Sequence, residues 1–177
     1  MGTDPGFPNS KTAFTILGQV DDSVIHAIYS KQFENSGTEK MVSHTWNLIK
    51  QFKLNDRISK VFVDASQPGF IRSVLASLGQ FQNYEVWVEK SKRDNIPLYK
   101  LMHIVPVPFT GEKHKLMLGN CKKLLDNGVI AIDADVHKDL IQELRLASAE
   151  EDMTLDKKEF SFDLLDSFRL ALEFVKY

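Results

Sequence analysis

The segment KVFVDAS, residues 60–66, carries the strongest indication of the fold. Its apolar residues follow one another without alternation and end at Asp64. Strands that are apolar on both faces usually lie in the middle of sheets that are covered by helices. Helices are predicted on both sides of it in the sequence, over 38–53, where apolar residues recur at helical spacing, and over 68–78. We therefore expect residues 60–66 to form a central strand of an α/β sheet.

Three β-rich segments come before this strand. Residues 11–20 and 23–33 are rich in β-branched and aromatic residues, and the pair Asp21-Asp22 between them is typical of a hairpin turn. Residues 2–4 are expected to form a short first strand. The order predicts three antiparallel strands at the start of the sheet.

Strands and helices alternate in the rest of the chain. We predict a strand over 84–89, a polar loop over 90–97, a helix over 112–126, a short strand or extended segment over 129–133, a helix over 136–147, an acidic loop over 149–159 and a last helix over 161–177. The expected architecture is α/β, with a central five-stranded mixed sheet and helices on both faces.

Composition limits the classes of function. The chain of 177 residues is expected to be a single domain, with 43% hydrophobic and 26% charged residues. Its net charge of −2 excludes a basic field over the whole surface, so contact with DNA or RNA has to come from local patches or through metal ions. With one cysteine, Cys121, no disulfide within the chain is possible. No membrane-spanning run or signal sequence is recognisable, so a cytoplasmic protein is expected.

Four aspartates lie at positions where they could form a metal-binding catalytic site. Asp4 ends the first strand and Asp64 ends the central strand, so they lie side by side if these strands are neighbours. Asp163 and Asp166 are three residues apart and share one side of the last helix. Crowded carboxylates repel one another unless a cation lies among them. Oxygen ligands suit hard divalent ions, and two such ions can promote phosphodiester hydrolysis.

Each aspartate also has a simpler interpretation. Asp4 belongs to an Asp-Pro-Gly turn, and Asp64 could cap the segment that follows it. Asp163 is favourable near a helix N-terminus through the helix dipole. Asp166 is harder to explain in this way, because it lies inside a strongly apolar helix.

Four segments resemble motifs of one superfamily. GTDPGFPNSKTAFTI (2–16) is similar to its opening strand motif, and KVFVDASQPGFIRSVL (60–75) resembles its second acidic segment. EKHKLMLGNCKKLLDNGVIAI (112–132) is similar to a helix that begins with a lysine, and FSFDLLDSFRLALEF (160–174) resembles the closing Asp-x-x-Asp helix. Together they resemble the RNase H-like (retroviral integrase) superfamily, and most closely the nuclease domain of phage-type terminase large subunits.

The resemblance implies an RNase H-like fold and a metal-dependent DNA endonuclease over the whole of 1–177. It implies that Asp4, Asp64 and Asp163 hold two Mg²⁺ or Mn²⁺ ions, with Asp166 as a fourth ligand or as a substitute for Asp163. In terminases this domain follows an ATPase motor, so we expect a domain excised from a longer chain. The implied partners are double-stranded DNA and the ATPase domain in cis, with the small terminase subunit and the portal protein as further candidates, in the cytoplasm of an infected or prophage-carrying cell.

Basic residues are expected to contact DNA phosphates, although a solvated surface is the ordinary role of such side chains. The candidates are Lys11, Lys90, Lys92, Arg93, Lys113 and Lys115. Lys115 matches the lysine of the family's helix.

Two other functions are compatible with these residues. A nuclease resembling Holliday-junction resolvases would share the chemistry and act on another DNA substrate. A catalytically silent RNase H-like docking module would keep the fold and bind no Mn²⁺.

Overall fold

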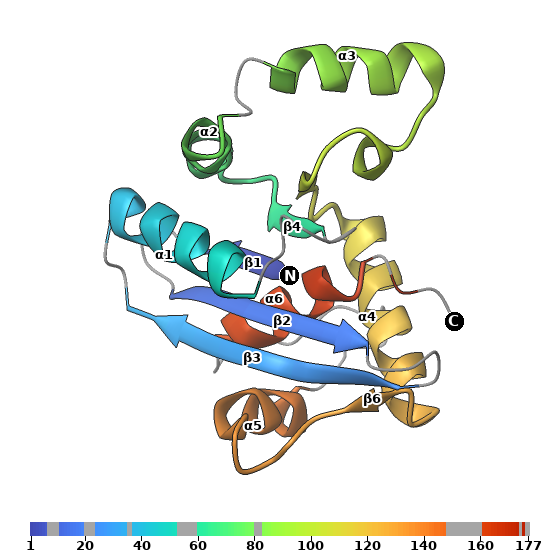
Figure 1. Cartoon of the computed structure of the whole chain (residues 1–177). Helices are drawn as coiled ribbons and strands as arrows, with labels where there is room; N and C mark the ends of the chain where they lie inside the picture. The colour runs from blue at the N-terminus through green and yellow to red at the C-terminus, as the bar shows by residue number, and fades with distance from the viewer. Residues whose placement is uncertain are drawn as a thin grey trace.

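The computed structural model describes residues 1–6, 11–19, 24–34, 37–52, 60–79, 83–147, 161–173 and 175. Within them the chain builds one mixed sheet of six strands in the order β5-β4-β1-β2-β3-β6 (Figure 1). The strands are β1 (Gly2–Pro5), β2 (Thr12–Gln19), β3 (Ile25–Phe33), β4 (Val61–Asp64), β5 (Ile104–Val107) and β6 (Ile130–Ala131).

The sheet directions agree with the sequence-based expectation. β1 to β3 form an antiparallel meander, and β4 lies parallel to β1 on its other side. β5 is parallel to β4, and the two-residue β6 is parallel to β3 at the far edge. Because all four residues of β4 are buried, it is the interior strand that its apolar run indicated. The sheet thus has six strands, one more than the five that were expected, and β6 lies in the segment 129–133 that was expected to be a short strand or extended.

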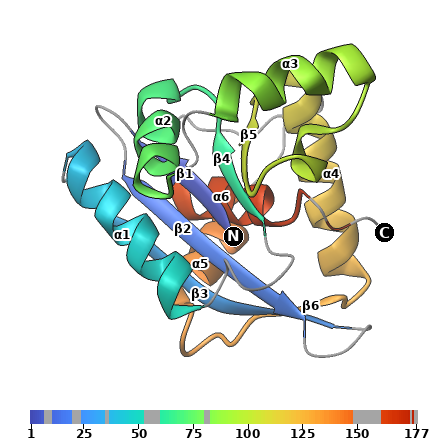
Figure 2. The ribbon, with the colours of Figure 1, turned by 45° about the horizontal axis from the view of Figure 1, so that its top comes forward.

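Helices cover both faces of the sheet, as Figure 2 shows. One core joins the sheet to α1 and α2, and a second core joins it to α4, α5 and α6. The helices are α1 (Thr38–Gln51), α2 (Pro68–Ser77), α3 (Tyr84–Asp94), the 3₁₀ turn η2 (Leu98–Lys100), α4 (Gly111–Asp126), α5 (Lys138–Leu146) and α6 (Asp163–Ala171).

The strand expected over 84–89 is wrong, since these residues begin α3. The residues of α3 that are half buried, Tyr84, Trp87, Val88 and Ser91, recur at helical spacing. Three β-forming residues of the segment, Tyr84, Trp87 and Val88, therefore pack along one side of a helix. The adjacent edge position of the sheet is taken by β5, whose apolar residues are buried.

Other differences are small or lie outside the described residues. The loop expected over 90–97 is helical as far as Asp94, and the last helix ends at Ala171 rather than continuing to residue 177. The expected turn at Asp21-Asp22 and the acidic loop over 149–159 fall outside the described residues. In the described ranges no helix is long and apolar enough to cross a membrane.

Candidate functional site

Helix α6 is the element around which the candidate site is built. Each of its nine residues is buried, because the sheet lies on one side and α4 and α5 lie on others (Figure 1). A helix buried all round has no solvated face for charged side chains. Asp163, Asp166 and Arg169 must therefore find partners inside the protein.

Two contacts fix α6 against the strands. A Cβ on Gly2 would lie 1.9 Å from the backbone oxygen of Ser167 and 2.4 Å from the nitrogen of Ala171, so the backbones of β1 and α6 almost touch there. The buried hydroxyl groups of Thr15 and Ser167 form a hydrogen bond of 2.7 Å between β2 and α6. These contacts place α6 directly over β1 and β2.

Asp4 and Asp64 face α6 from the carboxyl ends of neighbouring strands. Asp4 lies opposite Ala13, which is buried in the core that contains α6, so Asp4 is on the same face. Gly2 pairs with Phe62 in the parallel β1–β4 ladder, and the same register continued by two residues sets Asp64 beside Asp4. The strand order thus brings together two acids that are sixty residues apart in sequence.

The acid at the end of β4 is held by the turn that follows it. Asp64 is 8% exposed and accepts hydrogen bonds from the backbone N–H of Ser66 at 3.0 Å and from its hydroxyl at 2.6 Å. This is the local capping that the simpler interpretation proposed, and it also fixes the direction of the carboxylate.

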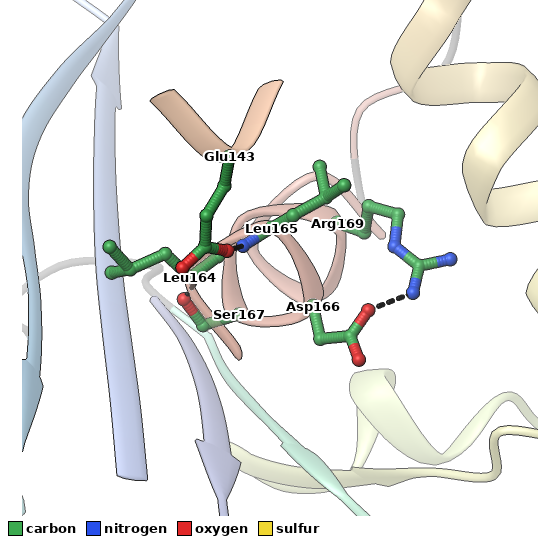
Figure 3. A network of polar contacts seen from close by, with 6 residues as sticks. All are labelled: Glu143, Leu164, Leu165, Asp166, Ser167 and Arg169. Atoms are coloured by element: carbon green, nitrogen blue, oxygen red, sulfur yellow. Dashed lines mark hydrogen bonds and ion pairs between the residues drawn. The ribbon is translucent and has the colours of Figure 1, made fainter. Parts of the chain in front are cut away.

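The two acids of α6 have different partners. Asp163 is 6% exposed and accepts a hydrogen bond from the hydroxyl of Ser161. Asp166 is 4% exposed and forms a buried ion pair with Nη2 of Arg169, one helical turn further on (Figure 3). The guanidinium carbon of Arg169 lies 5.5 Å from the centre of the Phe109 ring, just beyond the carboxyl end of β5.

A fifth acid, Glu143 of α5, reaches the N-terminus of α6. Its Oε2 accepts a hydrogen bond of 2.9 Å from the backbone N–H of Leu165, as Figure 3 shows. The first N–H groups of a helix have no partner within it, and no side chain at the N-cap position, Phe162, supplies one here. Glu143 is therefore a cap provided by a neighbouring helix.

The pKa of Glu143 is raised to about 7, mainly by burial. The negative charges of Asp163 and Asp166 contribute to this rise, whereas the hydrogen bonds from the N–H groups of Leu165 and Leu164 oppose it. The repulsion shows that this end of α6 is a region of negative potential.

The donor chemistry of these acids fits a hard divalent ion, since carboxylate oxygens are the ligands that Mg²⁺ and Mn²⁺ take. The arrangement is not that of a closed site, however. Within the described ranges, no group of three or more His, Cys, Asp or Glu side chains is close enough to hold a metal ion. Asp4 and Asp64 lie at the carboxyl ends of neighbouring strands, and α6 carries Asp163 and Asp166 over the same face of the sheet.

Most of the predicted DNA-binding residues are engaged with acids of the same chain. Ion pairs join Lys11 to Glu34 at 3.3 Å, Lys92 to Glu89 at 3.3 Å, Arg93 to Asp94 at 2.7 Å and Lys113 to Glu173. Lys90 and Lys115 are exposed.

The two basic helices have different relations to the acids. α4 begins shortly after the carboxyl end of β5, where Val107 lies opposite Asp64. α3 instead precedes the amino end of β5 and buries none of its residues. Of the two basic helices, α4 with Lys113 and Lys115 is thus the one that begins near the carboxyl ends of β4 and β5. Lys11 precedes Thr12, the partner of Pro5, and so lies beside the carboxyl end of β1.

Sequence reasoning missed Arg169 and Glu143. Arg169 follows Asp166 at ion-pair spacing, which was a usable signal once the helix was known to be buried. Nothing in the sequence near Glu143 indicates that it caps a helix that starts twenty residues later.

Comparison with known proteins finds similarity in the fold alone. No protein-family model matches the sequence, and no curated protein matches it. Two solved structures have the same fold over 97% of this chain, each at 15% identity. The nuclease domain of the large terminase g2p from bacteriophage SPP1, solved with bound Mn, gives a TM-score of 0.58 over 83% of its length, and the large terminase nuclease of the thermophilic phage G20c gives 0.61 over 78%.

The fold is RNase H-like. The expectation drawn from the four sequence motifs is thereby confirmed for the fold. In this RNase H-like domain, the candidate residues lie on the face of the central strands that α6 covers.

Proposed function

We propose that this protein is a metal-dependent endonuclease that cuts double-stranded DNA, as the nuclease domain of a terminase large subunit does in viral genome packaging. The proposal is carried by the strand register that sets Asp64 beside Asp4 and by α6, which carries Asp163 and Asp166 over the same face of an RNase H-like sheet. These acids come from three separate elements, and a fold needs no such convergence for its stability.

Asp4, Asp64 and Asp163 are the preferred metal ligands in this proposal, with Asp166 as the alternative to Asp163. The preference rests on the partners of the two α6 acids. Asp166 is already neutralised by the buried Arg169, whereas Asp163 accepts a hydrogen bond from a neutral hydroxyl. A carboxylate without a fixed counter-ion has more to gain from a cation.

Mg²⁺ or Mn²⁺ in such a site would activate a water molecule and stabilise the leaving oxygen of the phosphodiester. The residues of the chain orient the carboxylates. Ser66 holds Asp64 and Ser161 holds Asp163, so each hydroxyl fixes the direction in which a ligand oxygen points. Glu143 secures the first turn of α6, which carries Asp163.

DNA is proposed to approach over the start of α4. Lys113 and Lys115 lie there, next to the acidic edge of the sheet, and they would contact phosphates beside the cut. With a net charge of −2, binding should be weak and strongly dependent on salt. An ATPase motor in cis, a small terminase subunit and a portal protein are the proposed partners, in the cytoplasm of the infected cell.

The test is cleavage of supercoiled plasmid in Mg²⁺, Mn²⁺, Ca²⁺ or EDTA. We expect cutting in Mn²⁺ and Mg²⁺ only, and loss of at least about a hundredfold in Asp64→Asn and Asp4→Asn, because each removes a ligand charge. Asp126→Asn is the matched control, since Asp126 lies on the surface of α4 and pairs with Lys122.

Three results would contradict the proposal. Cutting in EDTA at the rate seen in Mn²⁺ would reject the metal mechanism. A folded wild-type protein that cuts neither plasmid nor a four-way junction in any of the metals would favour the silent docking module. Cutting of the junction alone would favour the resolvase-like alternative.

A further inference from the structure

A pocket of about 280 Å³ lies between α4 and the C-terminal half of α6. None of the carboxylates of the proposed metal site lines it. Arg169 connects the two, because it lines the pocket and pairs with Asp166. The pocket is lined by Lys113, Leu116, Met117, Asn120, Arg169, Leu172, Glu173 and Val175. Its polar members are mostly hydrogen-bond donors.

Arg169 has capacity for a further acceptor. Its side chain is completely buried, and one nitrogen, Nη2, bonds to Asp166. Nε and Nη1 have no hydrogen-bond partner among the described residues. A guanidinium group remains charged inside a protein, and leaving buried donors without an acceptor costs free energy. Arg169 lines the pocket, and its two unused donors therefore favour an anion as the occupant.

Lys113 supplies a second cation to the pocket. Glu173 is paired with Lys113 and would compete with an incoming anion for it. They form an ion pair in which both side chains are largely shielded, with 32% and 21% of their surfaces exposed. The carboxylate of Glu173 thus takes one of the three N–H donors of Lys113 and offsets its charge. An anion entering the pocket would compete with Glu173 for Lys113.

We propose that this pocket binds a phosphate group of the DNA backbone, next to the phosphate that is cut. Arg169 and Lys113 would hold it through charge-assisted hydrogen bonds, and the side-chain amide of Asn120, which now donates to the carbonyl oxygen of Val175 at 2.9 Å, lies at the same wall. At about 280 Å³, the pocket has room for a phosphate group. Because Arg169 also bonds Asp166, the bound phosphate would lie beside the acids of α6.

This inference rests on the proposed function for its choice of DNA as the source of the phosphate. The same chemistry would accept free inorganic phosphate. Binding is therefore to be measured without divalent ions and separately from cleavage, so that each idea can fail alone.

The experiment is an NMR titration in EDTA that follows the side-chain Nε–H signal of Arg169. Inorganic phosphate and a short DNA duplex are added in separate arms. We expect both to shift this signal in a saturable way. Lys113→Gln should weaken both about tenfold through loss of one charge-assisted bond, and Glu173→Gln should strengthen both several-fold by removing the competitor.

Lys122→Gln is the matched control, because Lys122 is on the same helix but outside the pocket, paired with Asp126 on the surface. It should change the affinity for phosphate by less than about twofold, in contrast to Lys113→Gln. The variants leave the buried arginine in place, so a failure to fold does not confuse the result.

No shift of the Arg169 signal in either arm would overturn the pocket as an anion site, as would equal affinities in the Lys113 and Lys122 variants. A shift with inorganic phosphate and none with the duplex would overturn DNA as the source. A shift with the duplex in a protein that cuts no DNA would support the pocket and reject the proposed function.

Discussion

At the scale of single residues, the most demanding feature is a charged pair enclosed by apolar surroundings. Asp166 and Arg169 are both buried on a helix that has no solvated side. Desolvation of two charges offsets most of their attraction, so such a pair adds little stability over apolar side chains of similar size. Either charge left alone in the same place is strongly destabilising.

Arg169→Met should lower the free energy of unfolding by about 3–5 kcal/mol, because it leaves the carboxylate of Asp166 buried without its counter-ion. Adding Asp166→Asn to the same protein should restore most of the loss. Urea denaturation of the single and double variants measures both values. If the double variant is less stable than Arg169→Met alone, Arg169 is not the main partner of Asp166.

At the scale of elements, the position of the acids depends on how closely α6 lies on β1. Gly2 allows this approach, since any larger residue would put a Cβ against the backbone of α6. Backbone atoms of a buried helix cannot move aside as the end of a side chain can. Because Gly2 has no side chain, β1, which carries Asp4, can lie against the backbone of α6, which carries Asp163.

Gly2→Ala should therefore destabilise the protein by about 3 kcal/mol, at the upper end of the cost of overpacking. Gly18→Ala is the matched control on β2. Its Cβ would meet only the Cδ1 and Cγ1 atoms of Ile28, a side chain 47% exposed and able to rotate away. Thermal unfolding of both variants makes the comparison, and equal losses would contradict the close contact between β1 and α6.

The contact between α5 and α6 makes stability depend on pH. The pKa of Glu143 is raised from 4.5 to about 7 in the folded protein, mainly by burial. Between these pH values the unfolded chain has lost the proton that the folded chain keeps, so this group makes stability fall as pH rises. Below the lower value the group is neutral in both states.

Glu143→Gln keeps an acceptor for Leu165 and cannot ionise. We expect its stability to match the wild type near pH 4 and to exceed it increasingly from about pH 4.5 to about pH 7. Urea denaturation across this range measures the difference. Parallel curves for the two proteins would mean that Glu143 titrates normally.

At the scale of the whole molecule, the fold could be predicted from local patterns and the site only in part. The buried run ending at Asp64 and the β-rich segments before it predicted the centre of the sheet, because periodicity reports burial directly. The segment 84–89 was assigned wrongly, since its β-forming residues favoured a strand and only the packing shows that one side of it is half buried in a helix. Val86, one of these β-forming residues, is exposed.

The candidate acids could be picked out because Asp4 and Asp64 lie at the ends of strands, Asp163 begins α6 and Asp166 interrupts an apolar helix. Their partners could not be found in the same way. Glu143 and Arg169 act through contacts between helices, and such contacts depend on how α4, α5 and α6 pack. Sequence spacing carries information about neighbours on one helix and very little about neighbours on another.

The most direct test of the central claim is to locate bound Mn²⁺ by anomalous X-ray scattering from crystals of this protein soaked in the ion. The account predicts Mn²⁺ between Asp4 and Asp64 at the edge of the sheet, with a further ligand from Asp163 or Asp166. It also predicts loss of that signal in Asp64→Asn crystals. Crystals that take up no Mn²⁺ at these carboxylates, or that hold it there equally well in the Asp64 variant, would contradict it.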